Sequence, residues 1–435
     1  MATNQGVKKL RFRDFHRNVK IRIIVGFAFS TAQATTFPFM AIYFAHNFGQ
    51  TTAGIVLALA IVASLFSGAI GGYYADRVGR RKVMLVAEMA FLVAYVAMAV
   101  ANLPQVNSPL LTLAGFFTTN VCWGIYGPAE EAMLLDVTRP EDRTLMYSIF
   151  YWMVNFTMAV GTSVGALLFE THRFALFAAM SVVVLGTWLS TLLLIEETHR
   201  PTTQPESVHP ILGMLRSYRG VLSDPVFFRY VVAGLLTMYG EFQMQGYIGV
   251  HFAQSVVSQP LVAWHNFVLR VDGVKLLGWV RTENTILVVL LATAAVRFTR
   301  GRSERWALWL GLGLQTAGYT VITYTSTPFV ALVAMAFATI GEVTNAPIRQ
   351  SYLGDLAPEH ARSAYVAVNG MTFQGTQLLT SLGVALGAVV PSWGMAVICL
   401  VLGTGGIVLY QSIVPNITSR RLAMESTQVS NASVS

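Results

Sequence analysis

Long uninterrupted apolar stretches most constrain how this 435-residue chain can fold. A helix needs about 20 apolar residues to cross the hydrocarbon core of a bilayer, and scanning for such stretches gives roughly twelve. We expect membrane-spanning helices over residues 22–46, 53–75, 83–102, 109–135, 145–169, 174–195, 226–254, 282–298, 305–324, 328–352, 364–389 and 392–414. The composition agrees, because 54% of the residues are hydrophobic and only 11% are charged, whereas soluble domains carry about 25% charged residues. The sequence therefore predicts an all-α polytopic membrane protein.

The basic residues alternate with these spans. The connections at 47–52, 101–108, 324–328 and 390–392 carry no charge, whereas the connections between them are basic. All but four of the 29 Lys and Arg residues fall on one side, and the exceptions are Arg173, Arg270, Lys275 and Arg281. By the positive-inside rule the basic side is cytoplasmic. We therefore expect an even number of spans in the plasma membrane, with both termini in the cytoplasm.

Several other classes of protein are excluded. The net charge of +8 does not predict a nucleic-acid partner, because the basic residues lie between apolar runs and form no soluble basic patch. The two cysteines, Cys122 and Cys399, lie in apolar stretches and predict no disulfide. The sequence has no phosphate-binding P-loop, no Gly-x-Ser-x-Gly and no metal-ligand spacing. We expect no enzyme, no ATP-driven pump and no cofactor other than a coupling ion.

The second half of the chain echoes the first. Three residues recur 219 positions later, with Pro128, Asp136 and Arg143 matched by Pro347, Asp355 and Arg362. Repeats at half the chain length are typical of transporters built from two related helical bundles, which rock about a site at the bilayer midplane. We expect a tail over 1–21, a six-helix bundle over 22–195, a polar linker over 196–224, a second six-helix bundle over 225–415 and a tail over 416–435.

The most specific motif lies between the second and third predicted spans. It reads Gly72-Tyr-Tyr-Ala-Asp76-Arg77-Val-Gly79-Arg80-Arg81-Lys82. Gly72 would let two helices approach closely, and Gly79 would permit a tight turn. Asp76 could pair with Arg80 or Arg143, or could face the positive N-terminus of another helix. This stretch resembles the signature loop of the major facilitator superfamily, G-x-x-x-D-R-x-G-R-R.

A larger part of the chain resembles the LmrP-type multidrug/proton antiporters of that superfamily. The stretches that carry the resemblance include Val19–Arg22, Gly54–Ala60, Ala132–Asp136, Tyr151-Trp152 with Asn155, and Gly341-Glu342. The chain departs from that group at Phe150, where the group carries an acid. The resemblance implies the major facilitator fold and, in a bacterial membrane, proton-driven export of lipophilic, often cationic, compounds by alternating access.

Charged residues inside the predicted spans indicate where protons could bind. Burying one such residue costs roughly 2.5–3.5 kcal/mol on insertion scales, so it persists where it is paired, faces a wet cavity or is functional. A carboxyl group in a low-dielectric cavity favours its protonated form, and can load a proton outside and release it inside. We predict a proton-coupling set of Glu342, Glu241, Glu130, Glu131 and Asp136.

Alternatives remain open for several of these acids. Glu241 could instead be a snorkelling or paired acid. Glu342 could instead form a structural pair with Arg349, which lies two turns further along the same face. Glu130 and Glu131 are adjacent, so at most one of them is expected to line a cavity. Glu88 could pair near the membrane interface, where Lys82 lies six residues earlier.

We also predict a gate and a substrate cavity. Asp136 and Arg143 would form a cytoplasmic latch with Arg80. Apolar walls with a few polar groups suit a promiscuous pocket, and aromatic ring faces attract cations; the alternative is that these rings face lipid or neighbouring helices. The candidate cavity residues are Arg22, Trp123, Tyr126, Tyr151, Trp152, Phe156, Tyr239, Phe242, Gln245, Asn345 and Arg349.

One extracellular β-hairpin is expected between the seventh and eighth spans. Residues 267–278 alternate in polarity around Asp272-Gly273, a dipeptide typical of a tight turn. The hairpin could be a lid or a packed loop.

The main hypothesis is a monomeric proton/drug antiporter whose partners are small lipophilic substrates and membrane lipids. A proton-coupled carrier or flippase for a lipid or a specific metabolite is the alternative. A membrane receptor or scaffold that does not transport is a third reading, against which the intramembrane charges argue.

Overall fold

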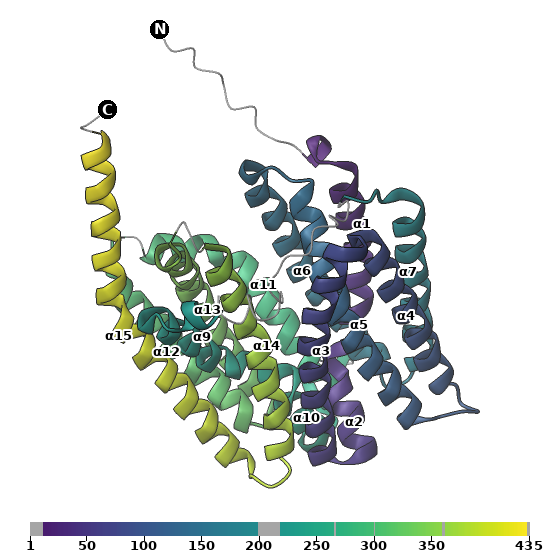
Figure 1. Cartoon of the computed structure of the whole chain (residues 1–435). Helices are drawn as coiled ribbons and strands as arrows, with labels where there is room; N and C mark the ends of the chain where they lie inside the picture. Colours follow the sequence, from purple (N-terminus) through teal and green to yellow (C-terminus); the bar gives the residue numbers. More distant parts are fainter. Residues whose placement is uncertain (1–11, 199–217, 265–266, 300, 359–361, 433–435) are drawn as a thin grey trace. The chain divides into compact units, whose positions relative to one another are not determined.

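The structure is a computed structural model, and it describes residues 12–198, 218–264, 267–299, 301–358 and 362–432 (Figure 1). These residues are almost entirely helical. The chain divides into two compact units, with residues 1–37 and 62–205 in unit 1 and residues 38–61 and 206–435 in unit 2. The division near residue 205 falls inside the predicted linker, and residues 38–61 belong to the second unit.

Unit 1 is built from helices of the first half of the chain. They are α1 (Arg17–Ala34), the second part of α3 (Gln50–Val78), α4 (Arg80–Ala101), α5 (Pro109–Asp136), α6 (Pro140–Leu168) and α7 (Arg173–Leu194), after the 3-10 turn η1 (Phe12–Asp14). Helix α4 packs against α5 and α7, and α1 packs against α6 and α7.

Unit 2 contains the helices of the second half and one segment from the first. Its elements are η2 (Phe37–Phe39), α2 (Met40–Phe48), the first part of α3, α9 (Pro225–Phe242), η3 (Gln243–Gln245), α10 (Tyr247–Ser255), α11 (Gly273–Thr299), α12 (Glu304–Tyr324), α13 (Pro328–Leu356), α14 (Arg362–Leu386) and α15 (Ser392–Ala432). Helix α12 packs against α13 and α15, α9 against α14 and α15, and α2 against α10. The interior next to α9 is filled by large buried side chains such as Phe227, Tyr352 and Tyr410.

Helices α5 and α13 occupy corresponding places in the repeat and carry prolines at corresponding positions. Each begins with a proline, Pro109 or Pro328. At the first position of a helix the amide hydrogen has no intrahelical acceptor, so proline costs no hydrogen bond there. Each also contains one internal proline, Pro128 or Pro347, which removes a backbone hydrogen bond and disturbs the helix. The two helices thus support the internal repeat seen in the sequence.

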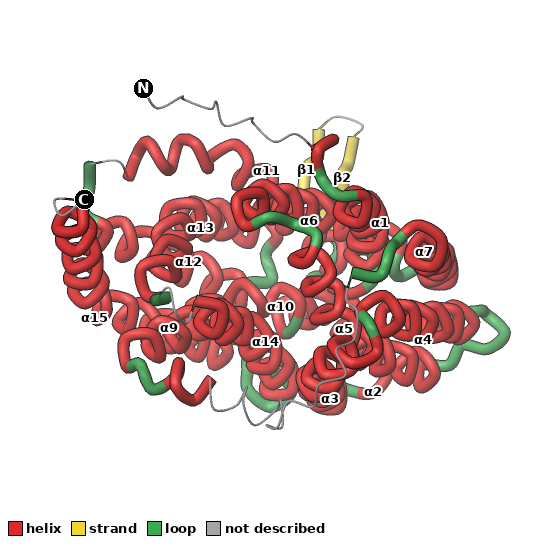
Figure 2. Tube along the Cα trace, turned by 45° about the horizontal axis from the view of Figure 1, so that its top comes forward, coloured by secondary structure: helices red, strands yellow, loops and turns green. Residues whose placement is uncertain are grey.

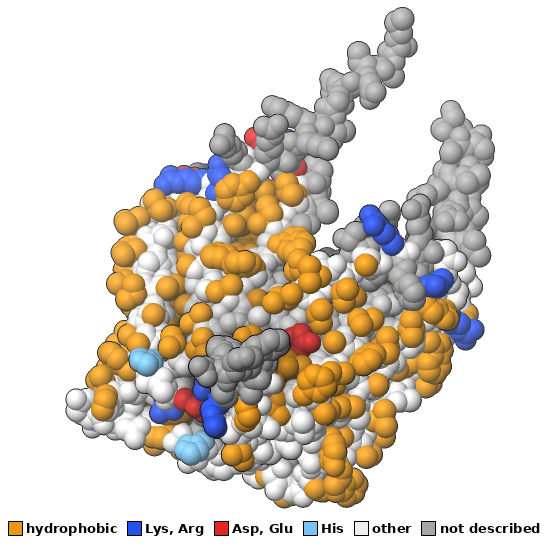
Figure 3. All heavy atoms as spheres, turned by 180° about the vertical axis from the view of Figure 1, so that it is seen from behind, with side chains coloured by type: hydrophobic (Ala, Val, Ile, Leu, Met, Phe, Trp, Pro, Cys, Tyr) orange, Lys and Arg blue, Asp and Glu red, His pale blue; other side chains and the backbone are white. Residues whose placement is uncertain are grey.

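All twelve predicted spans fall on helices, although two of them fall on helix pairs, α1 with α2 and α9 with α10. Among the described residues, seven helices are long and apolar enough to cross a membrane, so the number twelve stays a prediction. Large hydrophobic side chains are exposed along these helices, and they spread over the face shown in Figure 3. An apolar surface of this extent is expected where a protein meets lipid.

The predicted hairpin is present, but its position was wrong. Strand β1 (Gln259–Trp264) pairs antiparallel with β2 (Phe267–Val271), yellow in Figure 2. The Asp272-Gly273 pair is no turn between strands, because Asp272 Oδ1 accepts a hydrogen bond from the Lys275 amide at 2.9 Å and α11 begins there. Asp favours helix N-termini as well as turns, and here the helix prevails.

Candidate functional site

The signature loop forms a tight turn in unit 1 between α3 and α4. Gly79 has a φ of 106°, a backbone conformation that side chains other than glycine rarely adopt. The next residue, Arg80, forms an ion pair with Asp136 at the end of α5 and donates a hydrogen bond to the Ala132 carbonyl at 2.7 Å. Asp76 lies 3.9 Å from Arg80. The geometry brings together the Arg80–Asp136 half of the predicted latch, whereas the side chain of Arg143 lies outside the described part.

Glu197 completes this turn, and the sequence analysis missed it. Its carboxylate oxygens accept hydrogen bonds from the backbone amides of Arg80 at 3.0 Å and Arg81 at 3.1 Å. Amides at the start of a helix have no acceptor within the helix, so the Glu197 carboxylate supplies one. Its negative charge also lies at the positive end of the α4 helix dipole. The preceding apolar helix and the acid pair Glu196-Glu197 were the only local signals for this role.

The predicted close approach of helices at Gly72 was wrong by one residue. A Cβ atom at Gly72 would meet Pro128 at 3.8 Å, an ordinary contact, whereas one at Gly71 would lie 2.5 Å from the Ile125 backbone. Arg77 of the motif lies over the ring of Tyr73, 4.3 Å from its centroid.

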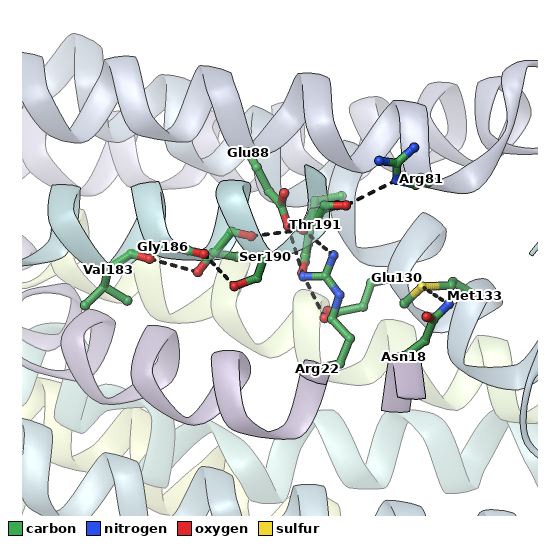
Figure 4. A network of polar contacts seen from close by, with 12 residues as sticks. Asn18, Arg22, Arg81, Glu88, Glu130, Met133, Val183, Gly186, Ser190 and Thr191 are labelled. Atoms are coloured by element: carbon green, nitrogen blue, oxygen red, sulfur yellow. Dashed lines mark hydrogen bonds and ion pairs between the residues drawn. The ribbon is translucent and has the colours of Figure 1, made fainter. Parts of the chain in front are cut away.

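A buried polar network joins four helices of unit 1 (Figure 4). Arg22 of α1 donates through Nη1 to Glu88 Oε1 of α4 at 3.0 Å and to the Tyr126 hydroxyl of α5 at 2.9 Å. Its Nη2 donates to the Thr191 hydroxyl of α7 at 2.7 Å, which in turn donates to Glu88 at 2.8 Å. The Tyr126 hydroxyl in turn donates a hydrogen bond to Glu130 Oε1 at 2.8 Å. A continuous chain of hydrogen bonds therefore runs from Glu88 to Glu130.

This network changes two expectations. Arg22 and Glu88 are only 1% and 2% exposed, so Arg22 is held in the interior of unit 1 and lines no open surface there. Glu88 forms an ion pair with Arg22 and not with Lys82.

Glu130 and Glu131 have different surroundings, as expected for adjacent residues, which point in different directions from a helix. Glu130 is half-buried and belongs to the network, whereas Glu131 is exposed and lies 3.5 Å from the hydroxyl of Tyr147 on α6. Of this pair, Glu130 is the one placed for a role inside the unit.

A second cluster of charged groups lies in unit 2. Glu342 of α13 accepts a hydrogen bond from Asn284 Nδ2 of α11 at 3.0 Å, and the same amide contacts the Thr339 hydroxyl at 3.0 Å. Glu241, near the end of α9, lies within electrostatic range of Glu342, Arg349 and Arg281. The two acids and two arginines are half-buried.

The cluster bears on two sequence expectations. Among the described side chains, no ion pair within 4.0 Å joins Glu342 to Arg349, although Arg349 acts on Glu342 electrostatically, so the two form no direct contact. Arg281 was placed in an outer connection, and this was wrong, because it lies inside α11 close to Glu241. It directly precedes the span predicted over residues 282–298.

Close backbone packing of α12 and α13 fixes the position of Glu342. A Cβ atom at Gly341 would lie 2.4 Å from the Gly311 carbonyl oxygen, so only glycine permits this approach. One turn further, Asn345 is fully buried and donates to Gln315 Oε1 at 2.8 Å. Asn345 is thereby a packing residue between the two helices.

The predicted cavity residues fall into two groups. Tyr126, Tyr239 and Phe242 are buried within their units, and Phe242 packs edge-on against Phe373 with ring centroids 4.8 Å apart. The exposed or half-buried members are Trp123, Trp152, Phe156, Gln245 and Arg349. The side chain of Tyr151 lies outside the described part.

Unit 2 has its own ionic cluster around Arg420 and Arg421 of α15. Arg420 donates three hydrogen bonds at 3.0 Å to the two carboxylate oxygens of Asp224, which also caps α9 by accepting from the amides of Val226 and Phe227. Burial raises the pKa of Asp224, but Arg420 and these amides outweigh it and hold the pKa below its usual range. Arg421 contacts Asp355 at 2.6 Å, so the acid that corresponds to Asp136 is paired from α15.

Two repeated helical units with apolar surfaces and buried charged clusters define a polytopic membrane transporter. The family model of the Major Facilitator Superfamily matches residues 23–376, and the chain belongs to this family.

The chain is similar to transporters with different names. It is 28% identical to a Na(+), Li(+), K(+)/H(+) antiporter of Planococcus maritimus, over 87% of this chain and 91% of that protein. It is 24% identical to the multidrug resistance protein MdtH of Edwardsiella ictaluri, over 82% of this chain and 81% of that protein. A crystal structure of a POT family transporter in complex with 5-aminolevulinic acid matches with a TM-score of 0.71 and 14% identity, covering 94% of this chain and 100% of that one. This last likeness shows the fold alone.

Proposed function

We propose that this protein exchanges protons for lipophilic, often cationic, compounds and exports them by alternating access. The observation that carries the proposal is the cluster of unit 2, in which two half-buried acids from different helices lie close together. Its relatives with names of multidrug resistance proteins support the same reading.

Glu342 is the residue to which we assign the exchanged proton. Its hydrogen-bond partner among the described residues is a neutral amide, that of Asn284 at 3.0 Å, whereas Arg349 acts on it only electrostatically. A carboxyl group held this way can bind a proton or a cation, because either one neutralises it. Since the two cannot occupy the carboxylate together, binding of one promotes release of the other, which is the coupling that antiport requires.

Two arginines balance the charge of the two acids in this cluster. When Glu241 and Glu342 are both ionised, their two negative charges equal the two positive charges of Arg281 and Arg349. An added cation is therefore favoured only close to the carboxylates. We assign Glu241 to the counterion of the arginines because both Arg349 and Arg281 act on it electrostatically.

A second candidate is exchange of a monovalent metal cation for protons. The carboxylate of Glu342 and the hydroxyl of Thr339 each lie 3.0 Å from Asn284 Nδ2, and hard cations prefer oxygen ligands such as these two groups. The relative from Planococcus maritimus is named for such an exchange. Among the described residues, no group of three or more His, Cys, Asp or Glu could hold a metal ion, so such a site would depend on neutral oxygen ligands beside Glu342.

Proton release from proteoliposomes distinguishes these candidates. The protein is reconstituted with a pH-indicating dye inside and an acidic lumen, so that the proton gradient is directed outward, and ethidium, tetraphenylphosphonium, NaCl, KCl or LiCl is added outside in turn. Drug/proton antiport predicts dissipation of the gradient by both organic cations and by none of the salts. A response to the salts alone would replace the main proposal by the second one, and no response at all would favour a lipid or metabolite carrier.

We further propose a monomer in the bacterial cytoplasmic membrane with both termini in the cytoplasm. The basic connections support this orientation. Protease treatment of intact cells and of inverted vesicles tests it, since a C-terminal tag should be cleaved only in the vesicles.

A further inference from the structure

The unit 1 network contains more carboxyl groups than positive charges. Arg22 supplies one charge, and Glu88 and Glu130 together supply two carboxyl groups. The network is therefore neutral when it holds one proton. We propose that it is a proton-binding site in which Glu130 takes the proton and Glu88 acts as a positioning residue that keeps Arg22 as its own counterion. This inference rests on the proposed function and adds to it a second proton site, separate from the unit 2 cluster.

The contacts distinguish the two acids. Arg22 bonds Glu88 directly at 3.0 Å and bonds it again through Thr191, so Glu88 holds the guanidinium by two routes. Glu130 reaches the guanidinium only through the hydroxyl of Tyr126. Glu88 is 2% exposed, whereas Glu130 is half-buried.

The remaining groups around the network do not alter this balance. The charged or titratable groups that face it are Arg22 of α1, Glu88 and Arg81 of α4, and Tyr126, Glu130 and Glu131 of α5. Arg81 donates to the backbone carbonyls of Thr191 and Leu192 at the end of α7. Glu131 is exposed and lies beside Tyr147 of α6, so its charge is screened by solvent.

The network also has unused polar atoms. Arg22 Nε and Glu88 Oε2 are buried without a hydrogen-bond partner among the described residues. Arg22 can therefore rearrange and move a hydrogen bond from Glu88 to Glu130 while some of its other hydrogen bonds persist. If Glu88 lost its charge, Arg22 would have Glu130 as its nearest carboxylate, and Glu130 would then stay ionised.

Infrared difference spectroscopy tests the proposal without any substrate. The purified full-length protein in lipid is compared at about pH 9 and about pH 6, a range in which ordinary carboxyl groups stay ionised. The signal is the carbonyl stretch of a protonated carboxyl group. We expect one component of this band to disappear in Glu130→Gln, and the same component to disappear in Glu88→Gln even though Glu130 is intact. Glu170→Gln, which changes an exposed acid, is the control and should retain it.

The outcomes separate a positioning role from a structural one. A Glu88→Gln protein that keeps the wild-type component would overturn the role of Glu88, and a Glu130→Gln protein that keeps it would overturn the site. If Glu88→Gln does not fold, Tyr126→Phe decides, because it keeps all charges and removes the hydrogen bond to Glu130. The component should then shift in frequency, and an unshifted component contradicts the proposal. A wild type that shows the component but moves no drug sustains this inference while refuting the proposed function.

Discussion

Replacing Glu88 by alanine should destabilise the protein far more than loss of a surface ion pair. The substitution leaves the Arg22 guanidinium, only 1% exposed, without a directly bonded carboxylate: its remaining hydrogen bonds are to the hydroxyls of Tyr126 and Thr191, and it reaches Glu130 only through Tyr126. Removing one partner of a buried pair costs about 3–5 kcal/mol, because the other charge stays desolvated. We expect a loss of this size in the free energy of unfolding, measured by reversible denaturation in mixed detergent micelles.

Two further variants make this prediction specific. The double variant Arg22→Met with Glu88→Met removes both charges, and should cost less than Glu88→Ala. Lys275→Met breaks the more exposed Asp272–Lys275 pair and should cost less than about 1 kcal/mol. The reasoning is refuted if Glu88→Ala costs no more than Lys275→Met.

Two predictions concern charge and backbone conformation elsewhere in the chain. Because the pKa of Asp224 is lowered in the folded protein, its carboxylate contributes stability above its unfolded pKa of about 3.9, and that contribution is lost as pH falls through the folded value. Asp224→Asn keeps a capping side chain, so thermal unfolding should show lower stability at neutral pH and a weaker decline towards acid; a decline equal to that of the wild type would contradict this. Gly79→Ala should destabilise by about 1–3 kcal/mol because of the positive φ, whereas Gly72→Ala, where a Cβ finds an ordinary contact, should not. Equal effects in the same denaturation assay would show that the turn is not strained.

The features that the sequence could predict depend on local pattern. Helices form over all twelve predicted ranges because apolar length alone specifies them in a bilayer. Gly79 was predicted at a turn, and its φ of 106° confirms this. The Arg80–Asp136 contact was predicted as part of the cytoplasmic latch, and the ion pair confirms that half of it.

The features that it could not predict depend on helix rotation and on distant partners. Arg22 and Glu88 are 66 positions apart, and nothing in an apolar span shows which face meets which neighbour. The role of Glu197 requires the chain after α7 to return to the start of α4, which no periodicity encodes. Asp272-Gly273 was assigned to a turn because the same residues favour turns and helix starts, and only the packing of α11 decides between them.

Dye efflux from cells tests the central claim, proton-driven export through Glu342, most directly. Cells that produce the wild type, Glu342→Gln or Glu170→Gln are loaded with ethidium, and efflux is followed with and without an uncoupler. The account predicts efflux by the wild type and by Glu170→Gln that the uncoupler abolishes, and no uncoupler-sensitive efflux by Glu342→Gln at equal membrane abundance. Full uncoupler-sensitive efflux by Glu342→Gln would contradict the assignment of the exchanged proton, and no efflux by the wild type would contradict drug export itself.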